Sequence, residues 1–83
     1  MHVQGGLKLS LQGDSRKDRR TRFAHVSLVA EHGTESVELV TDASGRMRYP
    51  LPEGDYVLAL DAGQRSRFRV GGGRWTTVRI SLS

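Results

Sequence analysis

The chain has 83 residues, with 13 Lys and Arg against 9 Asp and Glu, which gives a net charge of +4. This length allows one domain, spanning 1–83, and leaves no room for a deep cleft between two lobes. Because the chain contains no Cys, disulfide bonds and thiolate metal sites are excluded.

Alternation of apolar and polar residues predicts seven short strands, and no stretch shows the 3.6-residue apolar period of a helix. Each strand has one apolar face suited to burial and one polar face suited to solvent. Turn residues separate the strands, which is typical of a single antiparallel or mixed β-sandwich. The expected strands lie around residues 7–11, 24–28, 37–39, 47–51, 56–60, 68–70 and 78–82.

The polar segment 13–22 follows the first expected strand. It has no apolar period and is predicted to be a flexible basic loop. Its basic side chains could contact an acidic protein, a nucleic acid or an anionic membrane, or they could serve solubility alone. These side chains are Arg16, Lys17, Arg19, Arg20 and Arg22.

A tight turn at Pro52-Glu-Gly54-Asp55 separates the fourth and fifth expected strands. Pro52 presets φ for the turn, and Gly54 can adopt positive φ without a steric clash. A four-residue loop here predicts a hairpin whose apolar residues face one another on the two strands. The expected pairs are Leu51 with Tyr56, Tyr49 with Leu58, and Met47 with Leu60. Pro50 cannot donate to a ladder, so the first of these strands is predicted to be a sheet edge there, or to be bulged.

The triple glycine Gly71–Gly73 predicts a second hairpin, formed by the last two expected strands. A three-residue loop places Phe68 opposite Thr76 and Ser66 opposite Val78 on the buried face. A loop of even length would turn Phe68 outward while Val78 stayed inward.

This register gathers arginines and the single Trp on the outer face of the second hairpin. Arg69 is expected to stack on Trp75. Trp and Arg are enriched at binding hot spots, so the face is a candidate partner-binding site. The alternative is a solvated face that protects a strand edge from aggregation. The face comprises Arg65, Arg67, Arg69, Trp75 and Arg79.

Three spaced motifs follow Phe23. They are Ala24-His-Val26, Thr41-Asp42-Ala-Ser-Gly45 and Leu51-Pro52-Glu-Gly54-Asp-Tyr56. Their order resembles that of the transthyretin-like sandwiches, namely the carboxypeptidase regulatory-like and collagen-adhesin B-type repeat domains. Met47 departs from the commoner aromatic, and the basic loop has no counterpart in the motif.

The resemblance implies a seven-stranded sandwich of the transthyretin-like or immunoglobulin-like kind. Such modules are appended to carboxypeptidases, surface adhesins, outer-membrane receptors and bacterial secretion spikes, where they act as spacers, stabilisers or docking adaptors. The resemblance implies no catalytic residue, and fold alone does not establish function.

Residues that often carry chemistry form no recognisable set. The histidines lack the nucleophile, orienting partner or converging ligands that catalysis or zinc binding needs. Turn hydrogen bonding explains the acids better than a calcium loop does. These residues are His2, His25 and His32, with Asp42, Glu53, Asp55 and Asp61. We therefore expect no catalytic residue, metal or cofactor, and no enzyme activity.

Charge is distributed unevenly along the chain. The net charge is +4 over residues 1–22, −5 over residues 23–63 and +5 over residues 64–83. This asymmetry points to partners rather than to fold. The main hypothesis is a non-catalytic interaction, adaptor or structural module. It would dock an acidic protein partner, or a secretion-, adhesin- or peptidase-associated assembly, through its basic face. The acidic middle of a second copy could also serve, giving self-association.

Two other functions stay open on the sequence. A small basic domain with Trp75 as a stacking platform could bind nucleic acid. A carbohydrate-binding sandwich is weaker, because the chain has one Trp and no Asn. The N-terminal residues alternate and do not resemble a signal peptide, and no apolar run approaches the ~20 residues of a membrane span. A cytoplasmic location is therefore expected unless a larger exported protein carries the chain.

Overall fold

The computed structural model describes residues 5–14, 18–61 and 63–82. Over these residues the fold is all-β, with seven strands and one short 3-10 helix, and the seven predicted strands are confirmed. The strands are β1 (Gly6–Gln12), β2 (His25–Ala30), β3 (Ser36–Val40), β4 (Arg46–Pro50), β5 (Gly54–Leu60), β6 (Arg65–Val70) and β7 (Trp75–Ser81). The helix, η1, spans Arg19–Thr21 between β1 and β2.

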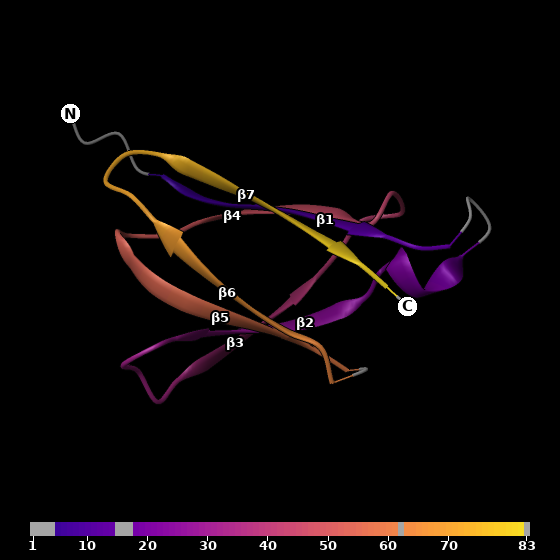
Figure 1. Cartoon of the computed structure of the whole chain (residues 1–83), viewed down its shortest axis with the longest axis horizontal. Coiled ribbons are helices and arrows are strands. Elements are labelled where there is room, and N and C mark those ends of the chain that lie inside the picture. The colour runs from indigo at the N-terminus through magenta and orange to yellow at the C-terminus, as the bar shows by residue number, and fades with distance from the viewer. Residues whose placement is uncertain (1–4, 15–17, 62, 83) are drawn as a thin grey trace.

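The strands form two facing sheets (Figure 1). One sheet has the strand order β4-β1-β7 and the other has the order β3-β2-β5-β6. In the three-stranded sheet, β1 is antiparallel to β4 and parallel to β7. Every pair in the four-stranded sheet is antiparallel. The predicted β-sandwich is therefore confirmed in its mixed form.

The apolar face of each sheet points into one core. Leu7 and Leu58, one from each sheet, are fully buried. Full burial of a Leu side chain contributes about 2 kcal/mol, so these alternating residues account for the packing of the two layers. The core comprises Leu7, Leu9, Leu11, Val26, Leu28, Leu51, Tyr56, Leu58, Leu60, Val70, Ile80 and Leu82.

The predicted hairpin around Pro52–Asp55 is wrong, because β4 and β5 lie in different sheets. β4 pairs with β1, where Tyr49 lies opposite Leu7. The turn therefore carries the chain from the three-stranded to the four-stranded sheet. Apolar residues of β4 point inward in either arrangement, so alternation alone does not distinguish pairing within a sheet from packing across the core. β4 is an edge strand, as Pro50 predicts.

The predicted hairpin around Gly71–Gly73 is wrong for the same reason. β6 pairs with β5, and β7 pairs with β1. Phe68 lies opposite Tyr56 on β5 rather than opposite Thr76, and the two rings stack with centroids 5.6 Å apart. The Tyr56 hydroxyl donates to the Pro52 carbonyl at 2.7 Å, which anchors the preceding crossing between the sheets.

A buried hydroxyl joins two other connections between the sheets. Thr41, which follows β3, is 2% exposed. Its hydroxyl donates to the Thr21 carbonyl at 2.7 Å and accepts from the Ala24 amide at 2.8 Å. Buried polar groups need such partners. Thr41 therefore fastens the β1–β2 connection to the β3–β4 connection.

Asp42 organises the turn that leads into β4. Its carboxylate accepts hydrogen bonds from the backbone amides of Arg46 at 2.9 Å and Ser44 at 2.8 Å. These bonds hold the pKa of Asp42 below its ordinary value. Gly45 closes the turn with a φ of +79°, and a Cβ atom there would lie 2.9 Å from the Thr21 Cβ. The Thr-Asp-x-x-Gly motif is thus used to build the turn.

Replacing Gly45 with Ala is expected to lower the free energy of unfolding by about 1–3 kcal/mol more than replacing Gly63 with Ala. Both glycines have positive φ, so each Ala carries a left-handed conformational cost. Only at Gly45 does the added Cβ meet other atoms, whereas nothing lies within 4 Å at Gly63. Urea unfolding of both variants measures the difference. Equal destabilisation would show that the contact with Thr21 is unimportant.

Asp42 is expected to make stability depend on acid pH. Its folded-state pKa lies below the ordinary value of 3.8. Its stabilising contribution is therefore complete above that value and is lost as the pH falls through the lower folded value. The Asp42→Asn variant keeps an acceptor oxygen but no charge, so it should lose less stability than the wild type between about pH 5 and pH 2. Thermal unfolding across that range tests this, with Asp61→Asn as the control. Parallel curves for Asp42→Asn and wild type would contradict the assignment.

Candidate functional site

The predicted Arg and Trp face is divided between the two sheets. Its three β6 residues point outward from the four-stranded sheet, and its two β7 residues point outward from the three-stranded sheet. They are Arg65, Arg67 and Arg69 on β6, and Trp75 and Arg79 on β7. The expected stacking of Arg69 on Trp75 is wrong, because Arg48 from β4 covers the ring instead.

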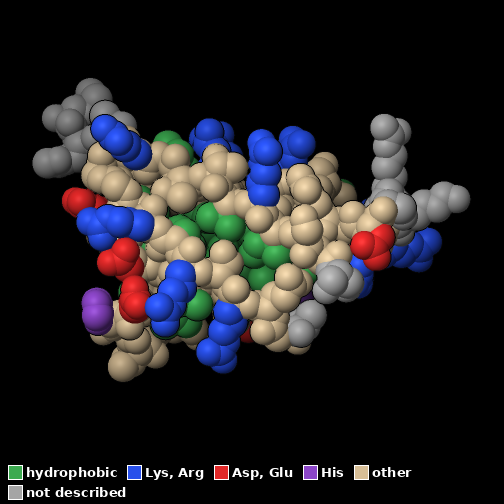
Figure 2. Space-filling model, in the orientation of Figure 1, with side chains coloured by type: hydrophobic (Ala, Val, Ile, Leu, Met, Phe, Trp, Pro, Cys, Tyr) green, Lys and Arg blue, Asp and Glu red, His purple; other side chains and the backbone are tan. Residues whose placement is uncertain are grey.

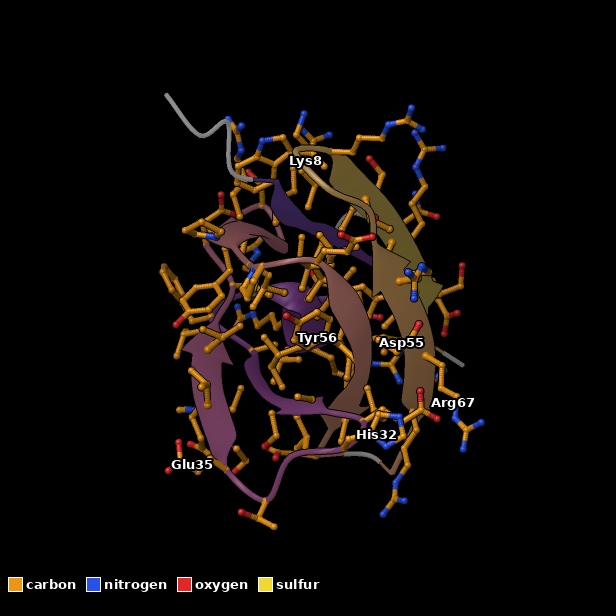
Figure 3. All side chains as sticks on the ribbon, turned by 90° about the vertical axis from the view of Figure 1, so that its left-hand side faces the viewer. Lys8, His32, Glu35, Asp55, Tyr56 and Arg67 are labelled. Atoms are coloured by element: carbon orange, nitrogen blue, oxygen red, sulfur yellow. The ribbon has the colours of Figure 1, made fainter. Side chains whose placement is uncertain are left out.

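Two of the β6 arginines have acidic neighbours, which lie on β5 or next to the ends of β2 and β5. Arg69 lies 3.1 Å from Asp55, its partner in the β5–β6 register, and 3.5 Å from Glu53. Arg67 lies 3.9 Å from Glu31. Asp55 and Arg67 are labelled on their neighbouring strands in Figure 3. These ion pairs are exposed and contribute about 0–1 kcal/mol each, but they offset part of the positive charge along β6.

The described part of the 13–22 loop contains the 3-10 helix η1. The sequence predicted a flexible loop here and no helix. Asp18 caps this helix by accepting from the Arg20 amide at 3.0 Å. The Arg20 guanidinium lies 2.6 Å from the same carboxylate. Hydrogen bonds from the side chain and the backbone amide of Arg20 hold the pKa of Asp18 well below the usual range.

The predicted loop residues border a small cavity at one end of the sandwich. The cavity is also lined by residues near the ends of β2, β5 and β7. Its polar lining comprises Arg19, Arg20, Arg22, His25, Asp61 and Gln64. The remaining predicted loop residues, Arg16 and Lys17, lie outside the described residues.

A second basic surface covers the outside of the three-stranded sheet. Lys8 on the central strand lies directly opposite Arg48. In the next row, Arg46 and Arg79 lie on either side of Ser10. β4, β1 and β7 contain no Asp or Glu. Figure 2 shows Lys and Arg side chains projecting at the top, where Figure 1 places this sheet. We define the basic face as Lys8, Arg46, Arg48, Trp75 and Arg79.

Trp75 fits against the central strand because Gly6 has no side chain. The two residues are partners in the β1–β7 register, and a Cβ atom on Gly6 would lie 2.7 Å from the indole ring. The Arg48 guanidinium lies 4.9 Å from the ring centroid. Such a cation–π contact contributes about 0.5–1 kcal/mol at an exposed site. The half-buried ring and Arg48 therefore hold each other in place.

The residues that the structure describes leave most of the positive charge of the basic face uncompensated. Lys8, Arg48 and Arg79 make no ion pair with any described residue. Asp42 borders the same shallow depression. Its Oδ1 accepts from two backbone amides, and its charge interacts with Arg46, so it offsets part of the charge at the Arg46 end of the face. Like charges directly opposite each other in a sheet are destabilising. The pairing of Lys8 with Arg48 therefore costs free energy in the isolated chain.

Lys8, Arg46 and Arg48 were not among the site residues predicted from the sequence. They meet through pairings of β1 with two strands distant in the sequence. One signal was present: the polar positions of all three strands carry basic or neutral side chains and no acid. That signal becomes a surface only when the three strands are known to be neighbours.

The described histidines lie away from this face, His25 on β2 and His32 in the turn after β2. His25 and His32 are exposed, and His2 lies outside the described residues. Within the described ranges, no three His, Asp or Glu side chains are grouped so that they could hold a metal ion. No helix in those ranges is long and apolar enough to cross a membrane.

The architecture is similar to that of several solved structures. The minor pilin of Streptococcus agalactiae has a TM-score of 0.78 and 21% identity, over 98% of this chain and 44% of the pilin. The 5-hydroxyisourate hydrolase of Klebsiella pneumoniae has a TM-score of 0.72 and 23% identity, over 94% of this chain and 89% of the hydrolase. The major pilin subunit of Bacillus cereus has a TM-score of 0.68 and 23% identity, over 95% of this chain and 28% of the pilin. No protein-family model and no curated protein matches the sequence.

These similarities confirm the predicted transthyretin-like β-sandwich. Because every identity is below 25%, the likeness establishes the fold alone. The chain spans less than half the length of either pilin and most of the length of the hydrolase. Proteins of different function thus share this architecture, as is common for simple folds.

Replacing Lys8 with Gln is expected to raise the free energy of unfolding by about 0.2–1 kcal/mol, because it removes one of two like charges in direct opposition. Arg79→Gln is the matched control, since Arg79 lies opposite the uncharged Ser10. Chemical unfolding at low ionic strength measures both changes. A loss of stability on replacing Lys8, or an equal gain at Arg79, would argue against repulsion between Lys8 and Arg48.

Proposed function

We propose that this chain is a non-catalytic assembly module that binds an acidic surface of a partner protein through the basic face. The observation that carries the proposal is the row of uncompensated cations beside an ordered Trp75. An acidic partner would relieve the repulsion between Lys8 and Arg48. Complementary charge also speeds encounter and selects partners, while Trp and Arg supply hot-spot contacts.

The structural neighbours support an assembly role. Two of them are pilins, and one of these is described as a subunit. Both are much longer than this chain, which corresponds to one part of each. A module of this kind contributes a rigid surface for contact with other parts of an assembly.

Catalysis is the competing class, because another neighbour is a hydrolase. A hydrolytic site needs a base within reach of the reacting group. The strands of the basic face contribute no His, Asp or Glu. Asp42 borders the same depression, but the amides of Arg46 and Ser44 hold its pKa below the ordinary value, which makes it a weak base. The described histidine on a strand, His25, belongs to the four-stranded sheet. The composition of the face therefore favours binding.

Nucleic acid is a less favourable ligand for the same face. Proteins that bind single strands without sequence preference stack bases on exposed aromatic rings. Here the Arg48 guanidinium lies over Trp75. A base would have to displace Arg48, whereas an acidic side chain could bind this guanidinium at its edge.

The test compares two triple variants that each remove three positive charges. Lys8→Gln/Arg48→Gln/Arg79→Gln neutralises the basic face, and Arg65→Gln/Arg67→Gln/Arg69→Gln neutralises the predicted β6 face. Cross-linked pull-downs from native lysate, followed by titration of the purified partner, should show at least about tenfold weaker binding for the first variant alone. Binding should also weaken with added salt.

Equal partner affinity for the wild type and the first variant would overturn the proposal. Loss confined to the second variant would assign binding to β6 instead. Partner recovery that disappears on nuclease treatment would favour nucleic acid. Unfolding curves for all three proteins establish that each variant is folded.

A further inference from the structure

The four-stranded sheet has an edge strand on each side. Among the residues that the structure describes, β3 pairs only with β2, and β6 pairs only with β5. Edge strands present unpaired backbone N–H and C=O groups to another chain. Each strand in the order β3-β2-β5-β6 is antiparallel to the next, so β3 and β6 run in opposite directions. A second copy in the same orientation would therefore place its β6 antiparallel to β3 of the first.

The β3 edge lacks the usual protection against pairing. Val37 and Val40 are 40% and 49% exposed. Lys, Arg and Pro, which normally blunt an edge, are absent from Ser36–Val40. The charge on this strand is that of Glu38, on the outer face of the sheet. β3 thus offers an apolar and acidic edge.

The β6 edge is complementary in charge. Its outward positions carry Arg65 and Arg67, while Phe68 points inward against Tyr56. The far end of β6 is occupied by its own chain, because the Arg69 carbonyl accepts from the Thr76 hydroxyl at 2.6 Å. In Figure 1, β6 and β7 diverge after their common turn, and just before β6 the Gln64 side chain donates to the Ser81 carbonyl at 3.3 Å. Between these two contacts with β7, Arg65 and Arg67 are exposed. Figure 3 shows Arg67 and Glu35, just before β3, on opposite sides of the molecule.

We propose that β6 of one copy adds to β3 of the next, extending the four-stranded sheet from chain to chain. In the matching register, Glu38 faces Arg67 on the outer side and Val37 faces Phe68 on the inner side. A slip by one residue would bring Arg67 toward the inner face. The alternation of both strands therefore selects the same pairing of faces.

This contact joins two different surfaces of the same chain. A heterologous contact of that kind repeats without closing on itself unless a rotation closes a ring. The inference rests on the proposed assembly role but uses the four-stranded sheet, whereas the basic face lies on the other sheet. The two ideas can therefore fail independently.

The experiment uses charge reversal at each edge. Glu38→Arg and Arg67→Glu, each alone, place like charges opposite each other, and each should weaken self-association at least tenfold in sedimentation velocity over a concentration series. The double variant Glu38→Arg/Arg67→Glu restores opposite charges and should associate to within about threefold of the wild type. The basic-face triple variant should associate like the wild type. Circular dichroism and unfolding curves confirm that every variant is folded.

A wild-type chain that stays monomeric at the highest concentration overturns the inference. So does association that both single variants retain, or a double variant that remains as weak as the single ones. The last result would show that Glu38 and Arg67 do not face each other across the contact. Association lost only in the basic-face variant would also overturn it, and would assign self-contact to the surface used for partner binding.

Discussion

The position of β1 between β4 and β7 is the constraint on which the rest of the structure depends. Its partners lie far along the chain, so four connections must pass from one sheet to the other. The same position brings Lys8 opposite Arg48 and lays Trp75 over Gly6. The pairing of β1 with β4 and β7 therefore determines both the sheet topology and the composition of the basic face.

The local features of the fold were predictable because they depend on neighbouring residues. Period-two alternation identifies all seven strands, and Pro50 correctly identifies an edge. The strand pairing was not predictable by the same reasoning. Tyr49 points into the core whether β4 pairs with β5 or with β1, so cross-strand consistency gave no discrimination. Choosing the correct partner of β4 would have required knowledge of the non-local pairings of β1. The energies of these pairings are spread over many weak contacts.

The candidate site was only partly predictable for a related reason. Trp75 and Arg79 do lie on one outer face, but their neighbours there are Lys8, Arg46 and Arg48. Of the β6 arginines, which the false hairpin had placed beside Trp75, Arg67 and Arg69 instead lie near acids on β5 or next to the ends of β2 and β5. Neither the ion pair of Arg69 with Asp55 nor the contact of Arg48 with Trp75 follows from spacing, because each depends on which strands are adjacent.

The parallel pairing of β1 with β7 has a mechanical consequence. Gly6, at the start of β1, and Ser81, at the end of β7, lie at opposite ends of this ladder, in a molecule 41 Å long and 16 Å thin. A pulling force applied through these two strands would run along them in opposite directions. It would load the hydrogen bonds between β1 and β7 together, in shear, instead of opening them one after another. Breaking these bonds together takes more force than opening them in sequence, so this pair of strands would resist such a pull.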